Sequence, residues 1–199
     1  IIVLILMKLK RKHQKKGKRG NMAESRNIAV LIKQKITEEE SKAKPSRSSR
    51  FDIGGTSHQL TVISLPLNLV VLNHRNHRLS AQLEDSGALS GIAPLSDKGQ
   101  EVIQQKLAET EKFPTLKQEL LDLGQREPGL ISPDGLLVNG NTRCAALREL
   151  QREGKGVSSI DVAVLPASVT ESEVRDLEIG LQMVKLTHQD YTFTNALLM

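Results

Sequence analysis

An apolar strand, a glycine and a helical pattern follow one another around Gly140, and this junction constrains the fold most. The strand ends in Leu137-Val138, and an alanine- and leucine-rich helix begins at Gly140 or Asn141 and runs to about residue 153. A helix that starts this way directs its first backbone N–H groups and the positive end of its dipole at one point. Because Arg143 lies in the first turn, the junction predicts a binding site for phosphate or another anion.

The hydrophobic pattern on either side predicts a small α+β domain with a mixed sheet and flanking helices. Ser96, and Thr170 with Glu173, are helix-capping signals, and Gly124 is a stop signal. Leu116, Leu120, Leu121 and Leu123 are expected on the apolar side of one helix. Strands are expected over 60–65, 129–132, 136–138 and 160–165, and helices over 97–110, 115–123, 141–153, from 171 onward and from 187 onward.

Composition shifts divide the chain into four parts. Residues 1–22 are read as a basic arm, either disordered or upstream of a natural start at Met22, and residues 23–50 as a helix followed by a flexible linker over 44–50. The main domain is expected over residues 51–186. Residues 187–199 are interpreted as the start of a truncated helical region.

Charge and residue usage limit the classes of function. The arm holds eight lysines and arginines and no acid. Since the whole chain has a formal charge of +5, the remaining residues carry −3, and the high pI of the chain comes from the arm. Aromatic residues are 2% of the chain, which argues against a base-stacking platform. The single cysteine fits a reducing, cytoplasmic setting, and the apolar run at residues 1–7 is too short to span a membrane.

Four features give residues 60–186 a resemblance to the ParB/sulfiredoxin-like superfamily, and within it to the N-terminal domain of ParB partition proteins. One is a helix that ends at Gly124 and is followed by a proline and a strand, and the other three are motifs. The first is an Asn-x-x-x-x-Arg segment, here Asn73 to Arg78. The second is Gly-x-x-Arg-x-x-Ala, here Gly140, Arg143 and Ala146. The third is a Leu-Gln step at residues 181–182, in a helix that follows a strand. The resemblance implies a ParB-like fold.

The resemblance also implies a nucleotide ligand, typically CTP and alternatively ATP. Gly140, Asn141, Thr142 and Arg143 would hold its phosphates, and Arg78 and Arg75 would add positive charge. The implied role is plasmid or chromosome partition, or transcription regulation, with a possible homodimer and with DNA bound by a helix-turn-helix beyond residue 199.

The chain departs from the family in its last motif. The positions that carry an acid, an asparagine and an arginine in partition proteins are here Ile179, Gly180 and Met183, and Glu178 lies one place off. Nucleotide hydrolysis and a role for Mg²⁺ therefore stay open. His74 and His77 have no third partner at ligand spacing, so no metal site of the protein's own is expected.

Two alternatives remain open from the sequence. One is a sulfiredoxin-like or kinase-like phosphoryl-transfer enzyme. Sulfiredoxins place a catalytic cysteine directly after the turn glycine, where this chain has Asn141, and Cys144 lies beyond Arg143. The other is an interaction module that binds no ligand.

Overall fold

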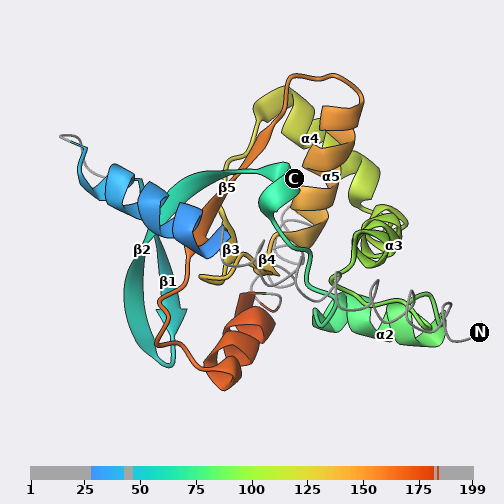
Figure 1. Ribbon diagram of the computed structural model, residues 1–199, viewed down its shortest axis with the longest axis horizontal. Helices are drawn as coiled ribbons and strands as arrows, with labels where there is room; N and C mark the ends of the chain where they lie inside the picture. The colour runs from blue at the N-terminus through green and yellow to red at the C-terminus, as the bar shows by residue number, and fades with distance from the viewer. Residues whose placement is uncertain (1–27, 43–46, 182, 184–199) are drawn as a thin grey trace, which may run out of the picture.

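The computed structural model describes residues 28–42, 47–181 and 183, and it shows an α+β fold (Figure 1). Its five-stranded sheet has the order β1-β2-β5-β3-β4. The pair β3 and β5 is parallel and the other pairs are antiparallel. The expected fold class, a mixed sheet with flanking helices, is confirmed. The basic arm and the helix expected from residue 187 lie outside the described residues.

The sheet begins with a hairpin of β1 (Ser48–Ile53) and β2 (Thr56–Pro66), joined at Gly54 and Gly55. Both glycines have positive φ, at 57° and 77°, as a tight turn between strands requires. The flexible linker expected over residues 44–50 is therefore wrong from Ser48 onward. The largely polar residues of β1 form a strand because β2 offers an edge to pair with. Next to β1, Arg47 forms an ion pair with Asp161 of β5 (Ser159–Val164).

A second hairpin carries the junction. Strand β3 (Gly129–Ile131) and strand β4 (Leu137–Asn139) confirm the strands expected over 129–132 and 136–138, and they pair through the Pro133-Asp134-Gly135 turn. Helix α5 (Asn141–Arg152) then leads to β5, which lies parallel to β3. The start of α5 is thus fixed by the end of a buried strand.

In the sequence, three helices lie between β2 and β3: α2 (His77–Asp85), α3 (Asp97–Ala108) and α4 (Phe113–Leu123). The Ser96 cap is confirmed, since its hydroxyl accepts a hydrogen bond from the Gly99 amide at 3.1 Å. The sequence pattern did not indicate α2, whose buried apolar contacts are limited to Leu79 and Leu83. The apolar side expected for α4 is half wrong, because Leu121 and Leu123 are exposed.

Two apolar clusters cover the two faces of the sheet. The larger includes buried side chains of α2, α3, α4 and α5, together with Ile28 and Ile32 of a helix over residues 28–40. The smaller joins residues of the sheet to Leu177, in a helix over residues 171–181. In Figure 1, α3, α4 and α5 gather on one side and the helix over 171–181 lies apart from them. None of the described helices is both long and apolar enough to cross a membrane.

Candidate anion-binding site

Gly140 sets the geometry of the junction. Its backbone is left-handed, with φ of 100° and ψ of 15°, and it stands at the N-cap position of α5. A Cβ atom on this residue would lie 3.2 Å from the Cα of Gly129, on the neighbouring strand β3. A side chain would therefore be strained by both the backbone conformation and the close approach of β3. The glycine is what lets a buried strand turn directly into a helix.

The first backbone amides of α5 have no partner inside the helix. Its first helical hydrogen bond runs from the Cys144 amide to the Gly140 carbonyl, at 2.8 Å. The amides of Asn141, Thr142 and Arg143 precede that bond, and no side chain caps this helix end. Three N–H groups and the positive end of the helix dipole therefore point at the same space, which is a favourable environment for an anion.

The guanidinium of Arg143 lies beside this turn. Its Nη1 atom is 3.8 Å from where a Cβ on Gly140 would be, and its side chain is only 14% exposed. Burial lowers its pKa, and the charge of Glu127 partly offsets this effect. The Nη2 atom is 3.7 Å from Glu127 Oε2, which is too long for a hydrogen bond, and the Glu127 side chain is 74% exposed. Arg143 is thus a largely buried cation with one loosely held acid beside it.

The side chain of Asn141 is used for contacts inside the fold. Its side chain is buried, and Oδ1 accepts a hydrogen bond from the Asn73 amide at 2.8 Å. Its Nδ2 donates to the Leu137 carbonyl at 3.4 Å. The carboxamide is therefore used within the fold, and the backbone amide is the group that Asn141 presents to a ligand.

Of the two other expected cations, Arg75 is not placed at the turn. The Arg75 side chain is exposed and is not among the described groups that line the cavity beside Gly140. Its backbone amide donates to Asn73 Oδ1 at 2.9 Å. Arg78 lies in the first turn of α2, and its side chain is outside the described part of the chain.

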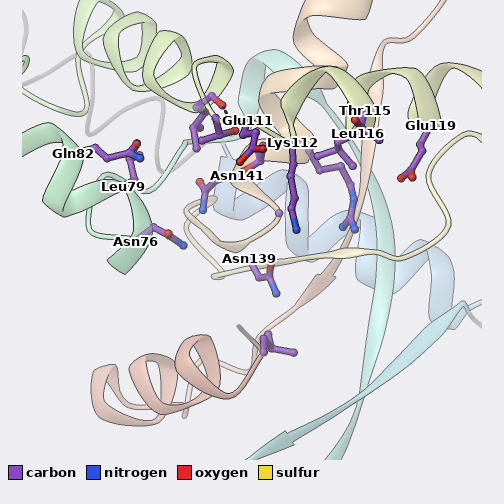
Figure 2. Close-up of a pocket in the computed structure, with 16 residues that line it drawn as sticks. Asn76, Leu79, Gln82, Glu111, Lys112, Thr115, Leu116, Glu119, Asn139 and Asn141 are labelled. Atoms are coloured by element: carbon purple, nitrogen blue, oxygen red, sulfur yellow. Dashed lines mark hydrogen bonds between the residues drawn. The ribbon is translucent and has the colours of Figure 1, made fainter. Parts of the chain in front are cut away.

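A cavity of about 670 Å³ opens in front of the turn (Figure 2). One wall is the junction itself, from Asn139 to Arg143, and another is α2 with Asn76, Leu79 and Gln82. The third wall is formed by the end of α3, the α3–α4 connection and one face of α4. Leu181 closes the cavity on the side of the helix over 171–181. Helix starts and polar side chains from distant parts of the sequence therefore meet at one place.

The wall formed by α4 was not predicted from the sequence. Lys112, Thr115, Leu116 and Glu119 line the cavity at the spacing of one helical face. Figure 2 shows the Lys112 side chain extending from the start of α4 toward the side where Asn139 lies, with Glu119 farther along the helix. The spacing was present in the sequence. The leucines of the same helix gave a stronger pattern, which predicts the buried side of the helix and not the side that faces a cavity.

Glu178 is the acid that the last helix turns inward. It is 5% exposed and accepts a hydrogen bond from Nδ2 of Asn76, which lines the cavity. Ile179 and Met183, where the family pattern carries polar residues, are 46% and 61% exposed. The helix therefore brings Glu178 into contact with Asn76, in the turn before α2.

Cys144 is a poor nucleophile in this fold. Its side chain is completely buried, and burial raises the pKa of the thiol to about 11, although Arg148 partly opposes this. The thiolate is the reactive form of cysteine, so the folded protein keeps this side chain inert at neutral pH.

Of the two histidines considered as metal ligands, the structure describes the side chain of His74, and the side chain of His77 lies outside the described part of the chain. Nδ1 of His74 is buried and has no hydrogen-bond partner, and burial lowers the pKa of the imidazole, with Arg75 adding to the effect. Among the residues that the structure describes, no group of three His, Cys, Asp or Glu side chains is arranged to hold a metal ion.

The fold and the site define an α+β protein with a polar cavity at a helix N-terminus. No family model, no curated protein and no solved structure matches the chain. The candidate site therefore rests on its own geometry.

Proposed function

We propose that this chain is a ParB-like module that binds a nucleoside triphosphate, CTP or ATP, with the phosphates at the Gly140 turn. The observation that carries the proposal is the convergence of three unpaired helix amides and the Arg143 guanidinium at one wall of the cavity. Lys112 adds a second cation on the opposite wall. Backbone donors and cations around one space favour an anion with several charged oxygens.

The rest of the cavity suits the remainder of a nucleotide. Its volume of about 670 Å³ lies within the range of small-molecule sites. Leu79, Leu107 and Leu116 supply apolar surface for a base. Glu111 and Glu119 are acceptors for sugar hydroxyls or base amino groups, and their negative charge disfavours phosphate at their own end of the cavity. The charges of the lining thus favour an orientation with the phosphates at the Gly140 turn and the sugar and base toward Glu111 and Glu119.

A cellular role at DNA, in partition or transcription regulation, is part of this proposal and is supported by the motif resemblance. A sulfiredoxin-like reaction is less well supported, because the chain's single cysteine is the buried Cys144. One observation favours a module that binds no ligand. Arg143 already has Glu127 beside it, and a stronger pairing would close the site.

Replacing Arg143 tests the proposal. We expect CTP or ATP to raise the melting temperature of the wild-type chain, with a stabilisation of about 2.7 kcal/mol at a hundred times the dissociation constant. Arg143→Ala should abolish the shift, because it removes the cation at the phosphate position. Arg126→Ala is the matched control, since Arg126 is an exposed arginine next to Glu127, and it should respond like the wild type.

A second variant distinguishes a nucleotide-binding site at Arg143 from a site closed by the pairing of Arg143 with Glu127. Glu127→Gln removes the competing carboxylate, so calorimetry should show tighter nucleotide binding than in the wild type. If the wild type and Glu127→Gln both bind none of CTP, ATP, GTP or UTP, the nucleotide proposal is wrong and the ligand-free module stands.

A further inference from the structure

The two edges of the sheet differ in what lies beside them. Strand β4 forms one edge and β1 the other. The outer side of β4 is covered within the chain, since the Leu137 amide donates to the Val71 carbonyl at 2.9 Å. On the outer side of β1, no described group bonds to the backbone of Arg50 or Asp52. Within the part of the chain that the structure describes, the edge of β1 is therefore open to another strand.

The hydrogen-bonding groups of this edge alternate along β1. The Val62 amide of β2 donates to the Arg47 carbonyl at 2.7 Å, and the pairing then continues to the end of β1 without a shift. Because every second pair of an antiparallel ladder exchanges hydrogen bonds, the odd-numbered residues of β1 bond to β2. The backbone N–H and C=O groups of Ser48, Arg50 and Asp52 therefore point away from the sheet.

The side chains along this edge are complementary to their own reversed order. Arg50 and Asp52 are exposed, and since they are two positions apart they lie on one face of the strand. Phe51 is on the other face, half-buried against the smaller apolar cluster. When two copies of β1 run antiparallel with Phe51 at the centre, Arg50 of each copy lies opposite Asp52 of the other. Both cross-strand pairs then join opposite charges, which stabilises a pair of strands.

The backbone and the charges select this register. Arg50 and Asp52 both direct their backbone groups outward, so each facing pair exchanges two hydrogen bonds. A shift of one copy by one residue sets outward groups opposite inward ones and forms no ladder. A shift by two residues centres the pairing on Arg50 or on Asp52, and like charges then face each other. Only the register centred on Phe51 pairs both the backbone groups and the opposite charges.

We propose that β1 is a self-association edge for a second copy of this chain. The two copies pair antiparallel through residues 49–53, about a twofold axis at Phe51, and their sheets become continuous. The contact is short beside the roughly 20–30 residues that each partner places in a stable interface, so the dimer is weak and forms as concentration rises.

The proposed interface is separate from the candidate anion site. No residue of β1 lines the cavity at the Gly140 turn, and in Figure 1 the β1–β2 hairpin extends away from α3, α4 and α5. The inference therefore goes beyond the proposed nucleotide function and does not depend on it.

Exchanging the two charges tests the interface, by sedimentation of the full chain without nucleotide. The average mass of the wild type should rise with concentration toward that of a dimer. Arg50→Asp and Asp52→Arg each set like charges opposite one another in both pairs, so each should weaken association about tenfold or more. The double variant, with both substitutions, restores opposite charges and should recover the wild-type dissociation constant. Arg126→Asp, at an exposed loop position, changes the net charge as Arg50→Asp does and should match the wild type.

Cross-linking tests the register itself. Phe51→Cys places two thiols in a facing pair without hydrogen bonds, whose Cα atoms lie about 4.5 Å apart, a separation that a disulfide spans. Incubation with oxidised glutathione should therefore give a reducible dimer. Ser57→Cys, exposed on β2 and one strand farther from the axis, is the control and should give little. The native Cys144 is buried, and burial raises its pKa to about 11, so it does not contribute.

The outcomes separate this inference from the nucleotide proposal. If the wild type stays monomeric at every concentration, or if Phe51→Cys cross-links no more than Ser57→Cys, the proposal is wrong. It is also wrong if the single charge variants associate like the wild type, or if a folded double variant fails to regain association. Circular dichroism checks that each variant is folded. Whether CTP binds, measured separately by calorimetry, decides the proposed function and leaves this result unchanged.

Discussion

At the scale of the residue, Gly140 is the position on which the candidate site depends most. It allows β4 to end and α5 to begin within one residue, and so exposes three amides at the edge of a cavity. Its φ of 100° strains any residue that has a side chain, and a Cβ atom on it would lie only 3.2 Å from the Cα of Gly129. The exposed amides of α5 and the close approach of the turn to β3 therefore both depend on this glycine.

Replacing this glycine should cost stability as well as binding. We expect Gly140→Ala to destabilise the fold by about 1–3 kcal/mol, because alanine is strained in this backbone region. Gly156→Ala is the matched control. Gly156 also has a positive φ, of 73°, but a Cβ there would meet nothing within 4 Å. Urea unfolding should show the larger loss for Gly140→Ala, and equal losses would contradict the role given to the Gly129 contact.

At the scale of the element, the helix over residues 171–181 is defined by its own first turn. The Thr170 amide and hydroxyl both donate to Glu173 Oε2 at 2.8 Å, and the Glu173 amide donates to Thr170 Oγ1 at 3.3 Å. This reciprocal cap confirms the capping box predicted from the sequence. It fixes where the helix starts, and so which residues face Asn76.

The cap should make the stability of this helix depend on pH. Hydrogen bonds from Thr170 lower the pKa of Glu173 below its usual 4.5. The contribution of Glu173 is therefore present above the unfolded value and is lost as pH falls through the lower folded value. Urea midpoints should show wild type above Glu173→Ala at pH 7 and a shrinking difference below about pH 4. A difference that persists at pH 2 would contradict this.

At the scale of the whole molecule, the helix over residues 28–40 is part of the main core. Ile32 is 1% exposed and Ile28 8%. A Cβ on Gly135 would lie 2.6 Å from Ile28 Cγ2, so the turn of the β3–β4 hairpin packs directly against this helix. The division placed near residue 50 therefore does not mark a break in packing.

Shortening one buried and one exposed side chain of the helix over residues 28–40 tests this arrangement. Ile32→Ala should destabilise the whole fold by about 2–5 kcal/mol, because it leaves a cavity in the shared core. Val30→Ala should change the free energy of unfolding by less than about 0.5 kcal/mol, since Val30 is 55% exposed. The lower free energy of unfolding of Ile32→Ala should appear as a shift of one cooperative unfolding transition. If Ile32→Ala unfolds with the wild-type midpoint, the helix is not part of the cooperative unit.

Local signals in the sequence determined much of this protein. The strand–glycine–helix junction, the second hairpin, the Ser96 cap and the Thr170–Glu173 cap depend on residues a few positions apart, and each forms as expected. For the same reason the sequence alone predicts that the turn amides and Arg143 lie close together. The position of Arg75 relative to the turn, and the hydrogen bond of the Asn141 side chain to Asn73, depend on contacts between distant segments that a local pattern does not contain.

Only the tertiary structure decided what surrounds the junction. The strand at Ser48–Ile53 forms because β2 has an edge to pair, and α2 is short of apolar residues that would reveal its period. The α4 face reaches the cavity because its other side packs on α5, where Lys117 holds Glu149 at 2.9 Å. Glu178 meets Asn76 across 102 residues of chain. Such contacts carry no signature in neighbouring residues, because their free energy arises when distant segments exclude water together.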